Sequence, residues 1–148
     1  MNRTLKIMLG TIIILGATVG TEYVRSAFAE VAVIVNKTNS VTTVKKSVLE
    51  RYFFRKTTKW DSGVEVMPID LRATDPARVE FSDSFLGRSP REVEVYWISQ
   101  SLVGGKSAPE VVNNSMLVKK YVASDSGAIG YINITDLDDS VKQVAVVD

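Results

Sequence analysis

The sequence has 148 residues with 18 basic and 17 acidic side chains, a formal net charge of +1, no cysteine and no histidine. A near-neutral chain without a long basic run lacks the electrostatic footprint of a nucleic-acid-binding protein or of a polybasic membrane patch. Without cysteine or histidine, disulfides, thiol nucleophiles, the usual zinc sites and the usual catalytic triads are excluded. Carboxylates and lysines are scattered without a motif, so we predict a non-enzymatic protein that needs no cofactor.

The first 29 residues are typical of a secretory signal peptide. Arg3 and Lys6 form a basic start, an apolar run covers residues 7–20, and Ala27-Phe28-Ala29 is a small-residue cleavage pattern. A retained membrane anchor is the alternative, but an apolar run of about 14 residues is shorter than the roughly 20 that a membrane-spanning helix needs. We predict cleavage after Ala29 and a periplasmic domain of residues 30–148 with no stable membrane anchor. Processing removes three basic residues and one acidic residue, which leaves 15 basic and 16 acidic side chains.

The predicted domain starts with a strand and a helix. Residues 30–37, EVAVIVNK, are a nearly continuous β-branched run, which predicts a strand buried on both faces at the centre of a sheet. Apolar residues at helical spacing then predict a helix over residues 44–53, with Ser40 or Thr42 as its cap. After a polar loop, residues 64–70 alternate like a strand, and the proline within them predicts an edge position or a point where pairing stops.

Two helix starts follow, and both combine a capping side chain with proline at the first helical position. Asp75-Pro76 opens a helix that we expect to stop near Gly87. Ser89-Pro90 opens a second helix, which Gly104-Gly105 ends. Both helices are therefore defined at the two ends by local sequence.

The last part of the chain predicts one more helix and two strands. The helix follows Ala108-Pro109, and its expected inner side consists of Val112, Met116, Leu117 and Tyr121. A glycine turn running into a strand is predicted for residues 124–134, and a final strand for residues 143–147. The alternation of buried strands with helices, without a repeat or a linker, indicates one α/β domain.

Two charged clusters each allow a functional and a simpler interpretation. The densest basic cluster consists of Lys45, Lys46, Arg51, Arg55, Lys56 and Lys59. A solvated helix face and a polar loop account for it; the alternative is a docking site for an acidic partner, in which Arg55, Lys56 and Lys59 face the partner. The acidic group Asp136, Asp138 and Asp139 lacks the glycine and the further oxygen ligands of a calcium loop. We therefore predict a solvated turn there and no metal site.

Three stretches, in this order, resemble segments of one family. RYFFRKTTKW (51–60), MPIDLRATDPARVEF (67–81) and VASDSGAIGYI (122–132) are similar to IFxGKxxxW, RxxSGTRxxF and PGAIGY of the phosphate-binding subunit of ABC transporters. The similarity extends from Val33 to about Ile134, and GAIGY and the K-x-x-x-W spacing are its most specific parts. The resemblance implies one lobe of a type-two periplasmic-binding-protein fold, with a central mixed sheet flanked by helices. The chain looks like the short stand-alone members of this superfamily, because the complete receptors have two lobes.

The resemblance also implies where an anion would bind. The family's Ser-Gly-Thr-Arg falls on Asp75, Pro76, Ala77 and Arg78, so the sequence has a carboxylate, a residue without N–H and a residue without hydroxyl at the first three positions. Asp75 instead fits the cap of its own helix. Arg72, Thr74 and Arg78 remain as the candidate anion-binding residues.

Two functions stay open from the sequence. One is an exported solute-binding-like protein for phosphate or a related oxyanion, accessory to uptake or sensing, in which a homodimer or another protein supplies the second wall of the cleft. The other is an envelope protein–protein interaction module that has lost solute binding. Nucleic acid is not expected as a partner in either case.

Overall fold

The computed structural model describes residues 30–148, so the predicted signal peptide lies outside the described residues. The strands are β1 (Val31–Val35), β2 (Thr43–Lys45), β3 (Met67–Leu71), β4 (Glu110–Val112), β5 (Ala128–Asn133), β6 (Lys142–Gln143) and β7 (Ala145–Val147). They form a five-stranded mixed sheet in the order β4-β3-β5-β1-β6 and a separate parallel pair of β2 and β7. The prediction of an α/β lobe with a mixed sheet is confirmed.

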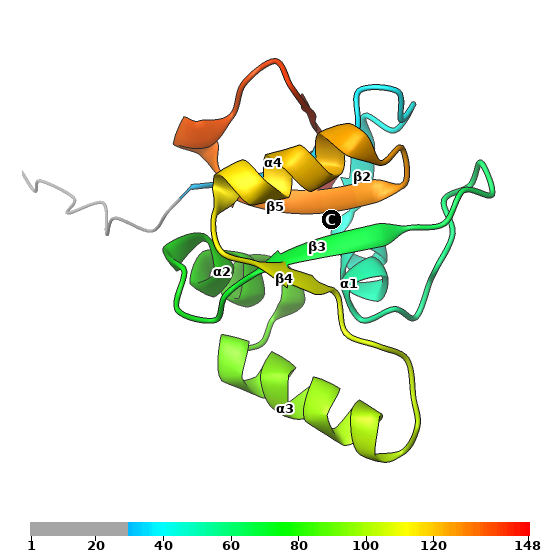
Figure 1. Ribbon diagram of the computed structural model, residues 1–148, viewed down its shortest axis with the longest axis vertical. Coiled ribbons are helices and arrows are strands. Elements are labelled where there is room, and N and C mark those ends of the chain that lie inside the picture. Colours follow the sequence, from blue (N-terminus) through cyan, green and yellow to red (C-terminus); the bar gives the residue numbers. More distant parts are fainter. Residues whose placement is uncertain (1–29) are drawn as a thin grey trace, which may run out of the picture.

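The helices cover both faces of this sheet. They are α1 (Lys46–Phe53), α2 (Pro76–Phe81), the π-helical turn η1 (Ser82–Leu86), α3 (Pro90–Leu102), α4 (Ser115–Ser124) and the 3₁₀ turn η2 (Ile134–Asp136). Helix α4 packs on β5, β3 and β1 from one side, and α2 packs on the same strands from the other. Helix α3 lies at the end of the sheet, beyond β4 (Figure 1), where it contacts η1 and packs on Phe54 at the end of α1. Among the described residues no helix is long and apolar enough to cross a bilayer.

The two capped helix starts are confirmed. Asp75 accepts a hydrogen bond from the backbone N–H of Ala77 at 2.9 Å, and Ser89 forms a reciprocal capping box with Glu92. The first of these helices continues through η1 and ends at Gly87, whose φ of 61° is a left-handed conformation that favours glycine. Local sequence therefore determines this part of the fold.

Three strand predictions need correction or refinement. Strand β1 is buried as expected, but the centre of the sheet is β5, which lies between β1 and β3. Strand β3 is an interior strand, and Pro68 marks the point where its pairing changes, because β3 pairs with β5 at Met67 and Pro68 and with β4 from Ile69 onward. The predicted final strand is two short strands, of which β6 pairs with β1 and β7 with β2.

Two helices begin later than the sequence predicts. Val44 lies in β2, where it pairs with Val146 of β7, so α1 begins only at Lys46 and has no side-chain cap. The segment after Pro109 first forms β4, and Asn114 then caps α4. The face of α4 that packs on the sheet also differs from the predicted one, because Val118 and Val122 are buried whereas Met116 and Tyr121 are exposed.

The two most specific stretches of the sequence are in contact with each other. The indole N–H of Trp60 donates to the backbone oxygen of Gly127 at 3.0 Å. A Cβ at Gly127 would collide with the backbone oxygen of Glu65, and a Cβ at Gly130 would collide with the side chain of Val118 on α4. Both glycines are required because neighbouring elements approach the backbone closely.

We expect Gly127→Ala to lower the free energy of unfolding by about 1–3 kcal/mol, because the added methyl group must displace a backbone segment. Urea unfolding followed by circular dichroism measures the change. Ser126→Ala is the control, since Ser126 is the exposed preceding residue. Equal stability of the two variants would contradict the close approach at Gly127.

Candidate functional site

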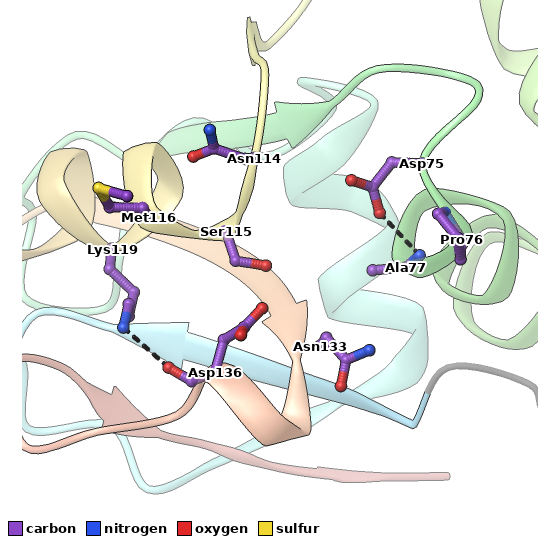
Figure 2. Close-up of a pocket in the computed structure, with 9 residues that line it drawn as sticks. All are labelled: Asp75, Pro76, Ala77, Asn114, Ser115, Met116, Lys119, Asn133 and Asp136. Atoms are coloured by element: carbon purple, nitrogen blue, oxygen red, sulfur yellow. Dashed lines mark hydrogen bonds between the residues drawn. The ribbon is translucent and has the colours of Figure 1, made fainter.

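A polar hollow of about 610 Å³ lies where the starts of α2 and α4 approach the end of β5 (Figure 2). Two helix starts at the ends of strands are a common setting for ligands in open α/β sheets. The lining residues are Asp75, Pro76, Ala77, Asn114, Ser115, Met116, Lys119, Asn133 and Asp136. The hollow is therefore the candidate binding site of the lobe.

The helix start on the α2 side is closed by its own residues. The Asp75 carboxylate accepts the hydrogen bond of the Ala77 N–H, and Pro76 has no N–H to donate. Figure 2 shows the Asp75–Ala77 bond at the rim of the hollow. An anion placed there would meet a carboxylate instead of free amide groups.

On the opposite side, the polar side chains are also engaged. Asn114 accepts from the N–H of Leu117 at 3.0 Å, and Asn133 accepts from the N–H of Thr135 at 3.0 Å. The ammonium group of Lys119 donates to the backbone oxygen of Asp136 at 2.8 Å and to the carboxylate of Asp138 at 2.5 Å. This hydrogen bond from Lys119 lowers the pKa of Asp138. Lys119 is thus held by acceptors of the protein itself.

The electrostatics of the hollow do not favour an anion. Its lining includes two carboxylates, Asp75 and Asp136, against the single ammonium group of Lys119. At about 4 Å and the effective dielectric of a surface site, each unit-charge repulsion amounts to roughly 4 kcal/mol. A charge-assisted hydrogen bond contributes about 1.5–3 kcal/mol in return.

Of the predicted anion-binding residues, Arg78 lies inside the fold. It is 3% exposed and forms an ion pair with the equally buried carboxylate of Asp70. The hydroxyl of Tyr131 donates to the same carboxylate, and burial raises the pKa of this tyrosine. Arg72 and Thr74 are exposed in the turn before α2, and neither lines the hollow. The structure therefore does not bring these three residues together.

The predicted partner-facing residues do not line the hollow, and they differ from one another in burial. Arg55 is half-buried, donates to the backbone oxygen of Val66 at 3.0 Å and pairs with Glu65 at 3.4 Å. Lys56 and Lys59 are exposed. Arg55 has a structural role, so only the two lysines present free positive charge.

Most residues of the hollow were not identified from the sequence. Asn114 and Ser115 fall inside a segment predicted as helix interior, and no motif surrounds Lys119 in the sequence. The polar dipeptide Asn113-Asn114 before an apolar run was the available signal for a capped helix start. Asp70 could have been noticed as a carboxylate among the apolar residues of a buried strand.

We expect Arg78→Ala to lower the free energy of unfolding by about 3–5 kcal/mol, because it leaves the Asp70 carboxylate buried without its partner. Arg72→Ala removes an exposed arginine and should change the stability by less than about 0.5 kcal/mol. Urea unfolding compares the two variants. Adding Asp70→Asn to Arg78→Ala removes the stranded charge and should recover part of the loss. Equal stability of the two single variants would contradict the structural role of Arg78.

No protein-family model matches the sequence, and no curated protein matches it. Solved structures do match. An ABC-type phosphate transport receptor from Vibrio cholerae aligns with 22% identity and a TM-score of 0.61 over 78% of this chain and 45% of its own. A protein from Clostridium perfringens, assigned as a phosphate ABC transporter substrate-binding protein and solved with bound phosphate, aligns with 23% identity and a TM-score of 0.57 over 78% and 44%.

A third structure, PstS from Borrelia burgdorferi, aligns with 12% identity and a TM-score of 0.60 over 78% of this chain and 46% of its own. The chain thus spans less than half the length of each of these proteins. At such low identity the agreement concerns the fold. The chain has the fold of a single lobe of the phosphate-binding receptors of ABC transporters.

Proposed function

We propose that the protein is an exported, non-enzymatic accessory protein of the cell envelope that acts by binding another protein. It uses one lobe of a phosphate-receptor fold, and this lobe does not hold phosphate on its own. Three observations support the proposal. They are the N-terminal export pattern, the fold shared with transport receptors, and the charged groups around the hollow, which already form hydrogen bonds within the protein.

One observation carries the proposal: the positive groups closest to the hollow and to the start of α2, those of Arg78 and Lys119, are already paired. The guanidinium of Arg78 is buried against Asp70, and the ammonium of Lys119 is bound by Asp136 and Asp138. Freeing Arg78 would leave the Asp70 carboxylate buried without its counter-charge, which is expensive. Freeing Lys119 would break its hydrogen bonds to the backbone of Asp136 and to the exposed carboxylate of Asp138. Phosphate capture would therefore need a rearrangement of the lobe.

Oxyanion binding is the second candidate function. It is favoured by the position of the hollow at two helix starts and by the phosphate bound to the Clostridium perfringens protein. In this case Arg72 and Thr74 would have to turn toward the hollow, and a second copy or another protein would supply the opposite wall.

Isothermal calorimetry with phosphate, and with sulfate as the control anion, separates the two candidates. We expect no saturable heat for the wild-type protein. Asp75→Ser removes the carboxylate from the rim and restores a hydroxyl donor, so we expect its phosphate affinity to exceed that of the wild type by about tenfold or more, into the measurable range. Asp83→Ser is the charge-matched control, because Asp83 is an exposed acid on η1, outside the hollow.

A phosphate-selective, micromolar signal from the wild-type protein would overturn the first proposal and support the second. The protein-binding role has its own test, in which the tagged protein is cross-linked in envelope extracts. We expect one partner to be recovered in stoichiometric amount. Recovery of no partner together with silent calorimetry would contradict both candidates.

A further inference from the structure

The outer side of α3 is apolar although no described element covers it. Val95, Ile98 and Leu102 are 56%, 60% and 81% exposed, and their spacing places them on one stripe of the helix. The opposite side of α3 is also apolar, since Val93 is buried and Trp97 packs against the core. A helix that is apolar on both sides is expected to be covered on both sides.

A groove runs between α3 and the edge of the sheet. It has a volume of about 360 Å³ and lies next to the exposed stripe, because Ile98 belongs to both. Its walls are mostly apolar and include Trp97, Pro109 and Val111. The Asp70–Arg78 pair lines its base, and Glu94 is the charged residue on the α3 side. The groove therefore fits an apolar group rather than an anion.

The strand beside the groove has a free edge. Strand β4 is the last strand of the sheet and pairs only with β3, and among the described residues no other backbone group bonds to its outer edge. Its central residue, Val111, is 53% exposed. An exposed edge strand with an apolar side chain is a template for pairing with another chain.

We infer that this groove binds an extended segment of a partner protein, which adds to the sheet as a strand beside β4 and inserts an apolar side chain between α3 and β4. Main-chain hydrogen bonds to an edge strand and side-chain pockets beside it are a recurring mode of peptide recognition. The inference rests on the proposed protein-binding function and names its surface and the chemistry of its partner.

The charges around the groove define the partner further. Glu94 lines the groove and Glu110 is exposed on β4, whereas Asp70 and Arg78 neutralise each other. The lining residues and β4 together therefore carry a negative net charge, so the segment that fits carries a lysine or arginine next to its apolar residue.

A phage library of random ten-residue peptides, selected on the immobilised protein, tests the inference. We expect enriched sequences that combine an apolar residue with lysine or arginine. Binding of the enriched peptides, synthesised with a fluorophore, is measured by fluorescence anisotropy. Ile98→Lys and Val111→Lys should each weaken binding at least tenfold, because they replace an apolar wall with a charge that repels the peptide.

Val79→Lys is the matched control, since Val79 is an exposed valine of α2 that does not line the groove, and it should leave the affinity unchanged. Glu94→Gln should weaken binding severalfold at low salt and less at high salt. Nuclear magnetic resonance adds a direct readout: the amide groups of Glu110 to Val112 should shift and gain protection from hydrogen exchange when the peptide binds. Unchanged unfolding temperatures show that the variants are folded.

Three outcomes would overturn the inference. The first is a library that gives no enriched sequence. The second is a set of enriched peptides whose binding is unaffected by Ile98→Lys and Val111→Lys but is lost with Lys56→Glu and Lys59→Glu, which places docking on the basic segment. The third is a dimer, seen by light scattering, that Ile98→Lys dissociates, which makes a second copy the occupant. Each of these leaves the proposed absence of phosphate capture untouched. That absence is decided separately by calorimetry.

Discussion

The ion pair between Asp70 and Arg78 connects the sheet to the helix that faces the candidate site. Asp70 lies on β3 and Arg78 on α2, both nearly fully buried, and Tyr131 of β5 donates to the same carboxylate. Removing two charges from water costs several kcal/mol per ion, and only mutual pairing with further hydrogen bonds offsets this cost. The pair therefore tolerates little displacement. It fixes α2 on the sheet and with it the rim of the hollow.

The apolar packing around the pair strengthens this constraint. The ring of Tyr131 stacks on Phe81 with a centroid distance of 3.8 Å, and Phe53 of α1 lies 4.7 Å from Phe81 and 5.8 Å from Tyr131. Helices α1 and α2 and strand β5 thus pack together through these three rings. A guanidinium held in this way is a structural group, and the N-cap of the same short helix is occupied by Asp75. The Asp75 carboxylate and the Arg78 guanidinium are thus both engaged within the lobe itself.

The sequence predicted features that depend on hydrogen bonds within one turn and missed those that depend on contacts between different helices and strands. The caps at Asp75 and Ser89 were predictable because a capping side chain bonds to the turn directly after it. The burial of Arg78 was not predictable, because its partner Asp70 lies on β3 and meets Arg78 only when α2 packs on the sheet, and because the resemblance assigned Arg78 to an anion. The start of α1 was also missed, since Val44 joins β2 only through its pairing with Val146, near the end of the chain. Such pairing overrides local helix propensity.

The hollow and the groove differ in whether their groups already have partners, and this difference decides where a ligand could gain binding free energy. At the hollow, Asp75, Lys119 and the two asparagines already have partners, so a ligand must first break existing bonds. At the groove, the apolar area on α3 and the outer edge of β4 have no partner among the described residues. Burying such area is favourable at about 25 cal/mol per Å², and pairing the free edge adds hydrogen bonds without breaking others. Association at the groove is therefore less opposed than solute capture at the hollow, although both belong to the same fold.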